Sequence, residues 1–433
     1  MKLRNLLHIQ ENDNHLIGSI TPPFFFRVSE IMREFIQLCD NNTIDASIDI
    51  LKEKYTESEF ENFQKRLENV KDKLFVDDEY KETNEIDFSS KVHILTLNVT
   101  RKCNLKCDYC FEDSEYRKLG NMPFDIAKKA IDTFFTTSTN TPSWAIVFTG
   151  GEPLLNYDLL KKVVEYIDNR GLKVEYRIKT NATLMDDERM DFLIKNNFKI
   201  QISLDGNEKA HDTHRKFADG KGTFKIVNEV VKQLIEKNYG TAVAISGTLS
   251  RQTIKYIEDS YAYLNLYDKS IKYSLKPVMH NSKNQFTFNI TDHQLFYEAT
   301  SKNAILLKRI SPNIFNNTKS NICGIGVWNI AIDVDGKIYP CYRLCGEKKY
   351  CIGDLFFLKL PLKLPYNISN IYKMEERRIC VKCSFVNVCK TGCYVDKLQY
   401  NENECFQKNR TGILNLLINE FKKNDLYKYL EIV

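Results

Sequence analysis

The sequence has no apolar stretch long enough to form a membrane-spanning helix. Its first residues, Met-Lys-Leu-Arg-Asn-Leu-Leu-His-Ile, give way to polar residues too quickly for a secretory signal peptide. Internal repeats and low-complexity tracts are absent as well. These absences lead us to expect a cytoplasmic protein with no membrane partner.

The charge is unevenly distributed along the chain. The net charge is +5, but residues 1–90 contain 11 Lys and Arg against 19 Asp and Glu, a local net charge of −8. Contacts with nucleic-acid phosphates need Lys and Arg, so this acidic part is not expected to bind DNA. The basic remainder is explained by a general excess of lysine, and we expect no nucleic-acid partner.

A chain of 433 residues is too long for one hydrophobic core, so two or three domains are expected. Its 43% hydrophobic and 27% charged residues are typical of a globular protein. The patterns described below divide it into residues 1–85, 90–310 and 318–433.

Residues 1–85 are predicted to form a small α+β domain with the plan of a winged helix. Two apolar segments, Leu6–Gln10 and His15–Thr21, flank a polar turn and predict a hairpin. Three helices and a closing strand are expected after it: a helix with Ile31, Phe35 and Leu38 on one face, a helix from about Ile44 to Tyr55, a helix that opens with the capping box Thr56–Glu59, and a strand at Leu74–Val76. The charged stretch 77–87 is predicted to be a linker.

The central region alternates apolar strand patterns with helical ones, which predicts a parallel α/β sheet. Its helical segments include those around Ile126–Phe134 and Ile226–Leu234. Six strands are predicted: Ile94–Val99, Trp144–Phe148, Val174–Lys179, Ile200–Leu204, Ala242–Thr248 and Ile271–Pro277. The pattern fits either an incomplete (β/α)6 barrel of the TIM type or an open doubly wound sheet. In both, the chemistry is expected at the carboxyl ends of the strands.

Thirteen cysteines need an explanation, because structural disulfides do not persist in a reducing compartment. Three lie at 103–110 and eight from Cys341 to Cys405, with Cys323 just upstream of the second group. Cys39 stands apart and is predicted to be an ordinary core thiol. The third region is rich in cysteine and has few long helical patterns before 411–429, so metal ligation is expected to stabilise it.

Cys103, Cys107 and Cys110 form a Cys-x3-Cys-x2-Cys run just after the first predicted strand. Three thiolates at this spacing can hold three irons of a [4Fe–4S] cube and leave the fourth iron open to a small molecule. A partial zinc site or three unrelated core cysteines are the alternatives, but zinc usually takes four ligands from paired Cys-x2-Cys units. The next predicted strand ends in Phe148-Thr-Gly-Gly-Glu-Pro153, where Gly150 and Gly151 allow a close backbone approach to a ligand.

The order and spacing of these two motifs resemble those of the radical S-adenosylmethionine (SAM) enzymes. The resemblance implies a partial barrel in which SAM chelates the open iron and is cleaved to a 5′-deoxyadenosyl radical that abstracts a hydrogen. It also implies that Tyr109 contacts adenine and that the Gly150–Glu152 turn meets the amino group of SAM. Four further positions resemble family positions that line the SAM site or bind its carboxylate, although all of them also fit ordinary turns: Asn181, Ser203, Asp205 and Arg215.

The second cysteine group resembles the SPASM extension of peptide- and protein-modifying radical SAM enzymes, which carries two auxiliary [4Fe–4S] clusters. A treble-clef zinc module is the alternative. By this resemblance one auxiliary cluster is held by Cys380, Cys383, Cys389 and Cys405, and the other by Cys323, Cys341 and Cys393. The second cluster lacks a fourth ligand, which Cys345, Cys351 or a substrate thiolate would provide.

Three functions are compatible with these features. We favour a maturase of a ribosomally made precursor peptide, because the region 1–85 resembles the element that binds leader peptides by strand addition. Such an enzyme would form a crosslink, for example a thioether, or epimerise a residue, without oxygen and with a flavodoxin, ferredoxin or reductase as electron donor. An anaerobic sulfatase maturase that makes formylglycine is the alternative, but it has an Asp where this chain has Tyr342. A redox sensor that binds DNA is disfavoured by the acidic N-terminal region.

Overall fold

The computed structural model describes most of residues 2–76, 92–278 and 324–358, together with a few positions between 284 and 299 and Val395. Gaps in these ranges lie at 4–6, 12–13, 21–22, 111–115, 136–143 and 327. The predicted ligands Cys323, Cys380, Cys383, Cys389, Cys393 and Cys405 lie outside the described residues, as does the predicted helix at 411–429. No helix among the described residues combines the length and apolarity needed to cross a membrane.

The first unit is an α+β domain with its own core. The strands β2 (Leu7–Glu11), β3 (Asn14–Ile20) and β4 (Pro23–Arg27) form an antiparallel sheet in that order, and the β2–β3 pair confirms the predicted hairpin. The short strands β1 (Lys2–Leu3) and β5 (Phe75–Val76) pair separately.

Three helices of the first unit are predicted well by the sequence. They are α1 (Glu30–Leu38), α2 (Ile44–Lys54) and α3 (Glu57–Leu74). The capping box at the start of α3 is present, since the Thr56 hydroxyl accepts from the Glu59 backbone N–H and the Glu59 carboxylate accepts from that of Thr56. Phe35 and Phe63 are fully buried and pack edge to face at 5.2 Å in the core of the unit.

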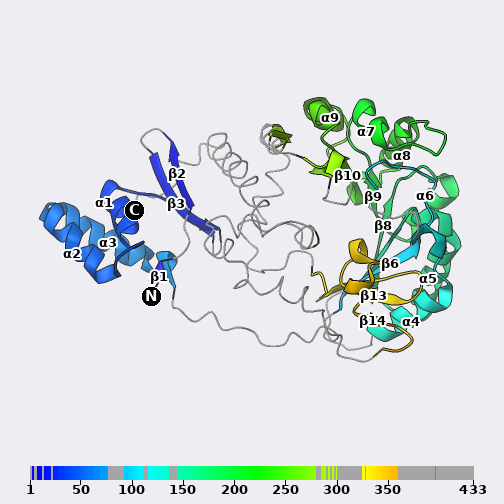
Figure 1. Cartoon of the computed structure of the whole chain (residues 1–433), viewed down its shortest axis with the longest axis horizontal. Helices are drawn as coiled ribbons and strands as arrows, with labels where there is room; N and C mark the ends of the chain where they lie inside the picture. The colour runs from blue at the N-terminus through cyan, green and yellow to red at the C-terminus, as the bar shows by residue number, and fades with distance from the viewer. Residues whose placement is uncertain are drawn as a thin grey trace.

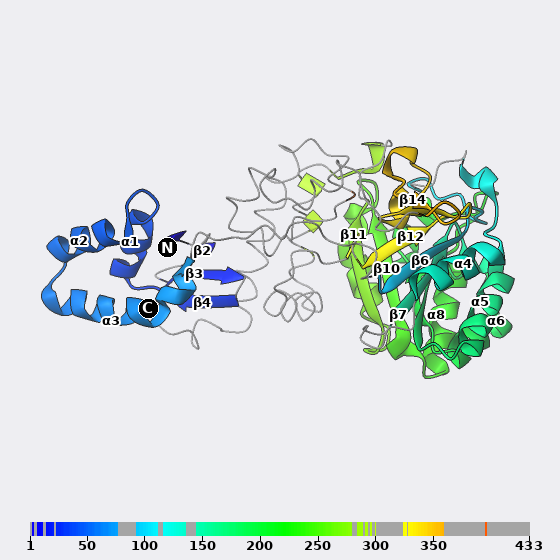
Figure 2. The same ribbon diagram turned by 90° about the horizontal axis from the view of Figure 1, so that it is seen from below.

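The central unit contains six parallel strands that run in sequential order across the sheet (Figures 1 and 2). They are β6 (Ile94–Thr100), β7 (Trp144–Gly150), β8 (Val174–Thr180), β9 (Lys199–Ser203), β10 (Val243–Leu249) and β11 (Lys272–Pro277), which confirms all six predicted strands. A doubly wound sheet would reverse its strand order at a switch point. The sequential order therefore favours the barrel alternative.

Helices cover one face of this sheet (Figure 2). They are α4 (Phe124–Phe134), α5 (Tyr157–Asn169), α6 (Asp187–Lys195), α7 (Glu208–His214), α8 (Phe224–Glu236) and α9 (Ile257–Leu264). In β8 the residues that face the helices, Tyr176 and Ile178, are buried in the main core, whereas Arg177 and Lys179 alternate with them and are half-buried. The other face of the sheet is therefore polar in β8, as the period of a strand dictates.

The cysteine-rich region continues the same sheet. The strand β12 (Asn329–Ile332) pairs in parallel with β6, and β13 (Lys337–Tyr339) and β14 (Gly353–Asp354) follow as antiparallel strands. Among the described residues the sheet therefore has nine strands, in the order β11-β10-β9-β8-β7-β6-β12-β13-β14. This connection between two predicted domains was not expected from the sequence.

Candidate functional site

The cysteine loop begins where β6 ends, at the carboxyl edge of the parallel strands. Cys103, Cys107 and Cys110 are half-buried thiols on this loop. The Cys110 backbone N–H donates to the Cys107 carbonyl at 3.1 Å and the Leu105 N–H to the Cys103 sulfur at 3.4 Å. Burial raises the pKa of the Cys103 thiol to about 12, so this thiol needs a cation to become a bound thiolate.

The turn at the end of β7 is hydrogen-bonded directly to the start of this loop. The Gly151 N–H donates to the Thr100 carbonyl and the Glu152 N–H to the Lys102 carbonyl, both at 2.9 Å. A Cβ atom at Gly150 would lie 2.1 Å from the Thr100 carbonyl oxygen, and one at Gly151 would lie 2.2 Å from that of Lys102. The two glycines are therefore required for contact between the two motifs.

The Glu152 carboxyl group points into the protein. It is fully buried and accepts from the Thr180 hydroxyl at 2.7 Å, the Asn181 N–H at 2.7 Å and the Leu154 N–H at 3.1 Å. Burial raises the pKa of this carboxyl to about 7. The side chain thus fixes the turn to the end of β8. The prediction that the turn meets the amino group of SAM therefore concerns the whole Gly150–Glu152 turn and not this carboxyl group alone.

Asn181 connects the end of β8 to the cysteine loop. Its Nδ2 donates to Asn104 Oδ1 at 3.0 Å and lies 4.0 Å from the Cys103 sulfur. Its Oδ1 accepts from the Thr183 N–H at 2.9 Å. Ser203, another predicted SAM contact, is half-buried at the end of the neighbouring strand β9. Both residues lie at the carboxyl edge of the sheet, as predicted.

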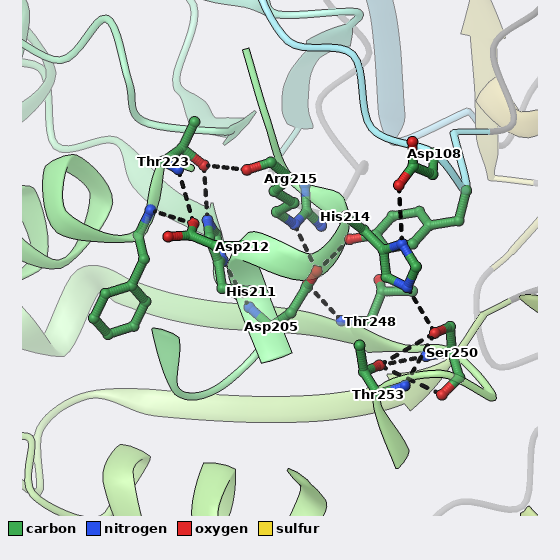
Figure 3. A network of polar contacts seen from close by, with 12 residues as sticks. Asp108, Asp205, His211, Asp212, His214, Arg215, Thr223, Thr248, Ser250 and Thr253 are labelled. Carbon is green, nitrogen blue, oxygen red and sulfur yellow. Dashed lines mark hydrogen bonds and ion pairs between the residues drawn. The ribbon is translucent and has the colours of Figure 1, made fainter. Parts of the chain in front are cut away.

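Asp205 organises the other side of the loop (Figure 3). This fully buried carboxylate accepts from Arg215 Nε at 2.9 Å, from the Thr248 N–H at 2.7 Å and from the Tyr109 hydroxyl. Within the described part of the chain the ion pair uses only Nε of Arg215, so both terminal nitrogens remain available for an anion. Arg215 also lies over the Tyr109 ring, at 5.5 Å from its centroid.

Four of the predicted positions, Tyr109, Ser203, Asp205 and Arg215, thus belong to one edge of the sheet, and the structure joins three of them directly. Asp205 contacts Tyr109 and Arg215 in this arrangement, so its carboxylate holds the groups predicted to contact SAM. The prediction that Asp205 itself contacts SAM stays untested.

Sequence reasoning missed two histidines of helix α7 that belong to the same network (Figure 3). His211 and His214 are both fully buried. His211 Nδ1 accepts from the Asp205 N–H at 3.2 Å and His211 Nε2 lies 2.9 Å from the Thr223 hydroxyl. A signal existed in the sequence, because two of only seven histidines fall within one helical turn directly before Arg215.

A buried ion pair links the cysteine loop to the strand β12 and the turn after it. Arg101, two residues before Cys103, donates through Nε at 2.9 Å and Nη2 at 2.5 Å to the two carboxylate oxygens of Asp333. Asn98 Nδ2 and the Val334 N–H also donate to Asp333, at 3.0 and 2.8 Å. The side chains of Arg101 and Asp333 are only 2% and 1% exposed.

Three cysteines of the second group are described, and they gather around one small core. Cys341, Cys345 and Cys351 pack with Tyr339. Cys345 is buried, whereas Cys351 is half-buried and donates to the Gly353 carbonyl at 3.2 Å. Cys345 and Cys351, the two candidates for the missing fourth ligand, therefore lie in the same apolar cluster as the predicted ligand Cys341.

The residue after Cys341 contacts the central sheet. Lys179 of β8 places its Nζ 3.9 Å from the centroid of the Tyr342 ring. The position that the sulfatase-maturase alternative would fill with an Asp thus holds an aromatic ring against a cation.

The donor set fits an iron–sulfur cube better than a single metal ion. No three His, Cys, Asp or Glu side chains among the described residues converge on one point that a metal could occupy. A cube takes one thiolate per iron, so its ligands need not converge, and three half-buried thiols on one anchored loop meet that requirement.

The model of the radical SAM superfamily matches residues 97–264, a range that contains the cysteine loop and the Gly150–Glu152 turn. Over 278 residues the chain is 30% identical to an uncharacterized protein of Methanocaldococcus jannaschii, with 63% of this chain and 91% of that protein covered. It is 26% identical over 334 residues to the cysteine-type anaerobic sulfatase-maturating enzyme of Clostridium perfringens, with 67% of this chain and 85% of that enzyme covered. It is 23% identical over 444 residues to the radical SAM cyclopropyl synthase TigE of Paramaledivibacter caminithermalis, with 93% and 88% covered.

Two solved structures share the fold. The structure of anSMEcpe with bound AdoMet has a TM-score of 0.59 at 21% identity and covers 75% of this chain and 98% of that chain. Streptococcus suis SuiB bound to the precursor peptide SuiA has a TM-score of 0.50 at 16% identity, with 92% of this chain and 97% of that chain covered. At these identities the likeness concerns the fold.

Proposed function

Because this chain belongs to the radical SAM superfamily and is an enzyme related to SPASM-type maturases, we propose that it modifies a ribosomally synthesised precursor peptide. The peptide would be held through its leader by residues 1–85, and the modification would be a crosslink, such as a thioether, or an epimerisation. Each of these begins with the removal of one hydrogen from the peptide.

The observation that carries this proposal is the separate N-terminal unit with its small antiparallel sheet. In the order β2-β3-β4 both outer strands have a free edge within the described part of the sheet. An extended peptide can add to such an edge through main-chain hydrogen bonds. SuiB, which shares the fold over nearly the whole chain, is described in complex with a precursor peptide.

The cofactors of the proposed reaction are SAM and three [4Fe–4S] clusters. The SAM-binding cluster would be held by Cys103, Cys107 and Cys110, and bound SAM would supply the 5′-deoxyadenosyl radical. The Gly150–Glu152 turn would bind the amino group, and Arg215, with two terminal nitrogens available, would bind the carboxylate.

The two auxiliary clusters are proposed on the cysteine pattern of residues 318–433. Within that region Cys345 and Cys351 share an apolar cluster with Cys341, which supports the proposal that one of the two thiols completes the ligand set of that auxiliary cluster. If both stay free, that iron is open to a substrate thiolate, which favours a thioether product.

A formylglycine-generating sulfatase maturase is the second candidate, favoured by the likeness to the Clostridium perfringens enzyme. Two observations weigh against it. Tyr342 replaces the Asp expected as general base, and its ring is covered by Lys179. In addition, an enzyme that modifies a short sulfatase segment would not need a separate N-terminal unit to bind a leader peptide.

The test is anaerobic co-expression with candidate precursor peptides, each with its leader, followed by mass spectrometry. Loss of two hydrogens per event indicates a crosslink, and an unchanged mass with solvent deuterium indicates epimerisation. The same peptide without its leader is the matched control and should stay unmodified. Equal modification of both peptides, or the same result after deletion of residues 1–85, would contradict the proposed recognition.

Iron and sulfide analysis tests the cofactors independently of the substrate. Three cubane clusters correspond to about twelve iron and twelve sulfide per chain. A value near four would leave only the SAM-binding cluster and would remove the SPASM assignment.

A further inference from the structure

His214 is a buried histidine that the radical SAM motifs do not account for. It ends helix α7 and lies between the cysteine loop and the turn after β10 (Figure 3). Its Nε2 is 2.7 Å from the Ser250 hydroxyl and its Nδ1 is 3.3 Å from Asp108 Oδ2. Its ring also packs edge-on against Tyr109, with centroids 5.1 Å apart. The histidine therefore contacts both residues between Cys107 and Cys110.

The surroundings of Ser250 determine which ring nitrogen carries the proton. Ser250 Oγ accepts from the backbone N–H groups of Gln252 at 3.0 Å and Thr253 at 3.3 Å. Its own hydrogen is then left to donate, and His214 Nε2 is the nearest acceptor. Nε2 is thus unprotonated and Nδ1–H points at Asp108. Burial, which lowers the pKa of His214, agrees with a neutral ring.

We infer that His214 is a positioning residue for the SAM site: its neutral ring, protonated on Nδ1, donates to Asp108 and holds the Asp108–Tyr109 segment of the cysteine loop. The inference depends on the radical SAM assignment and is independent of the proposed peptide substrate.

The contact joins an exposed side chain to a buried one. The Asp108 side chain is 51% exposed, whereas that of His214 is fully buried. The bond therefore connects the cysteine loop at Asp108 to the buried end of helix α7. Tyr109, the next residue, is held on its other sides by the Asp205 carboxylate and the Arg215 guanidinium. Loss of the His214 contact would release the edge of the loop that faces SAM while the three cysteines stay in place.

The second buried histidine of α7, His211, has the opposite tautomer to the one assigned to His214. Its Nδ1 accepts from the Asp205 N–H, so its Nε2 carries the proton and donates to the Thr223 hydroxyl, which in turn donates to the Arg215 carbonyl at 3.0 Å. The two histidines, three residues apart on α7, thus have opposite tautomers. His211 fixes the Asp205–Arg215 side of the site and His214 fixes the Asp108–Tyr109 side.

The test measures SAM binding to the full, anaerobically reconstituted chain by equilibrium dialysis, together with iron per chain. His214→Asn keeps a donor at the Nδ1 position but loses Ser250, whereas His214→Gln reaches Ser250 and loses Asp108. Asp108→Asn keeps an acceptor oxygen and Asp108→Ala removes it. Asp158→Ala, in an exposed pair with Lys161, is the surface control.

His214→Gln and Asp108→Ala should each weaken SAM binding about tenfold, the size expected for one lost hydrogen bond to a charged group. His214→Asn and Asp108→Asn should stay within about threefold of the wild type, and all variants should keep their iron.

Three results would overturn the inference. Wild-type affinity for SAM in Asp108→Ala would show that the contact between His214 and Asp108 does not contribute to SAM binding. Equal losses in Asp108→Asn and Asp108→Ala would show that the contact needs the charge, and hence a protonated histidine. Loss of iron from Asp108→Ala would show an effect on the cluster itself. The Asp108 variants decide alone if a His214 variant fails to fold, because Asp108 is exposed.

Discussion

Removal of the Asp333 carboxylate should strongly lower the unfolding free energy of the protein. In Asp333→Ala the Arg101 guanidinium would lose the carboxylate that pairs with it and would stay buried, because its side chain is only 2% exposed. Breaking a buried pair by removing one partner costs about 3–5 kcal/mol. Asn98 Nδ2 and the Val334 N–H would also lose their acceptor. We therefore expect a loss of unfolding free energy at the upper end of that range.

The measurement is urea denaturation followed by circular dichroism under anaerobic conditions. Asp191→Ala is the control, since Asp191 pairs with Lys237 at the surface with its side chain 64% exposed. An exposed pair contributes about 0–1 kcal/mol. The double variant Arg101→Met, Asp333→Leu should recover the part of the lost stability that comes from the unpaired charge, although Asn98 Nδ2 and the Val334 N–H still lose the Asp333 acceptor. The reasoning is refuted if Asp333→Ala costs no more than Asp191→Ala.

Three further changes test other parts of the argument. Gly151→Ala should displace the cysteine loop, because the added Cβ would lie 2.2 Å from the Lys102 carbonyl. It should lower iron by about four per chain. In Gly171→Ala the φ of +65° strains the alanine but its Cβ meets no atom within 4 Å, so this control should keep its iron. Glu152 has a folded-state pKa of about 7, above its usual 4.5, so its ionisation should cost stability as the pH rises from 4.5 to 7. In urea titrations the unfolding free energy of the wild type should fall by about 3 kcal/mol between pH 4.5 and pH 8, and Glu152→Gln should not show this fall. An identical pH dependence in both proteins would contradict the assignment. Thr56→Ala should destabilise the N-terminal unit by about 1 kcal/mol and Thr56→Ser by much less, as measured by thermal unfolding.

Local patterns in the sequence predict the strands well, and they predict that the cysteine loop and the Gly150–Glu152 turn lie at strand ends. The six parallel strands appear as short apolar runs between helical patterns, and the cysteine loop and the Gly150–Glu152 turn follow two of them directly. Because the carboxyl ends of parallel strands share one edge, motifs at strand ends must meet there. The strand β4 was missed, because Pro23 and the nearby Pro22 indicate a turn rather than an edge strand.

Contacts between distant residues could not be predicted in this way. The sheet order that separates a barrel from a doubly wound sheet depends on pairing between strands far apart in the sequence. Arg101 and Asp333 are 232 residues apart, and nothing local to either residue indicates its partner. The inward direction of the Glu152 side chain depends on Thr180 and Asn181, which belong to the next strand.

The pairing of β12 with β6 has a consequence for how the protein could be divided. A fragment that ended near residue 310 would leave the β6 edge bare, with a row of main-chain donors and acceptors facing solvent. Bare edges of this kind associate with other chains. The same fragment would also leave Arg101 without its carboxylate. The parallel strands therefore need β12 to cover the edge of β6. Shortened versions of the enzyme should aggregate unless they retain residues 329–339.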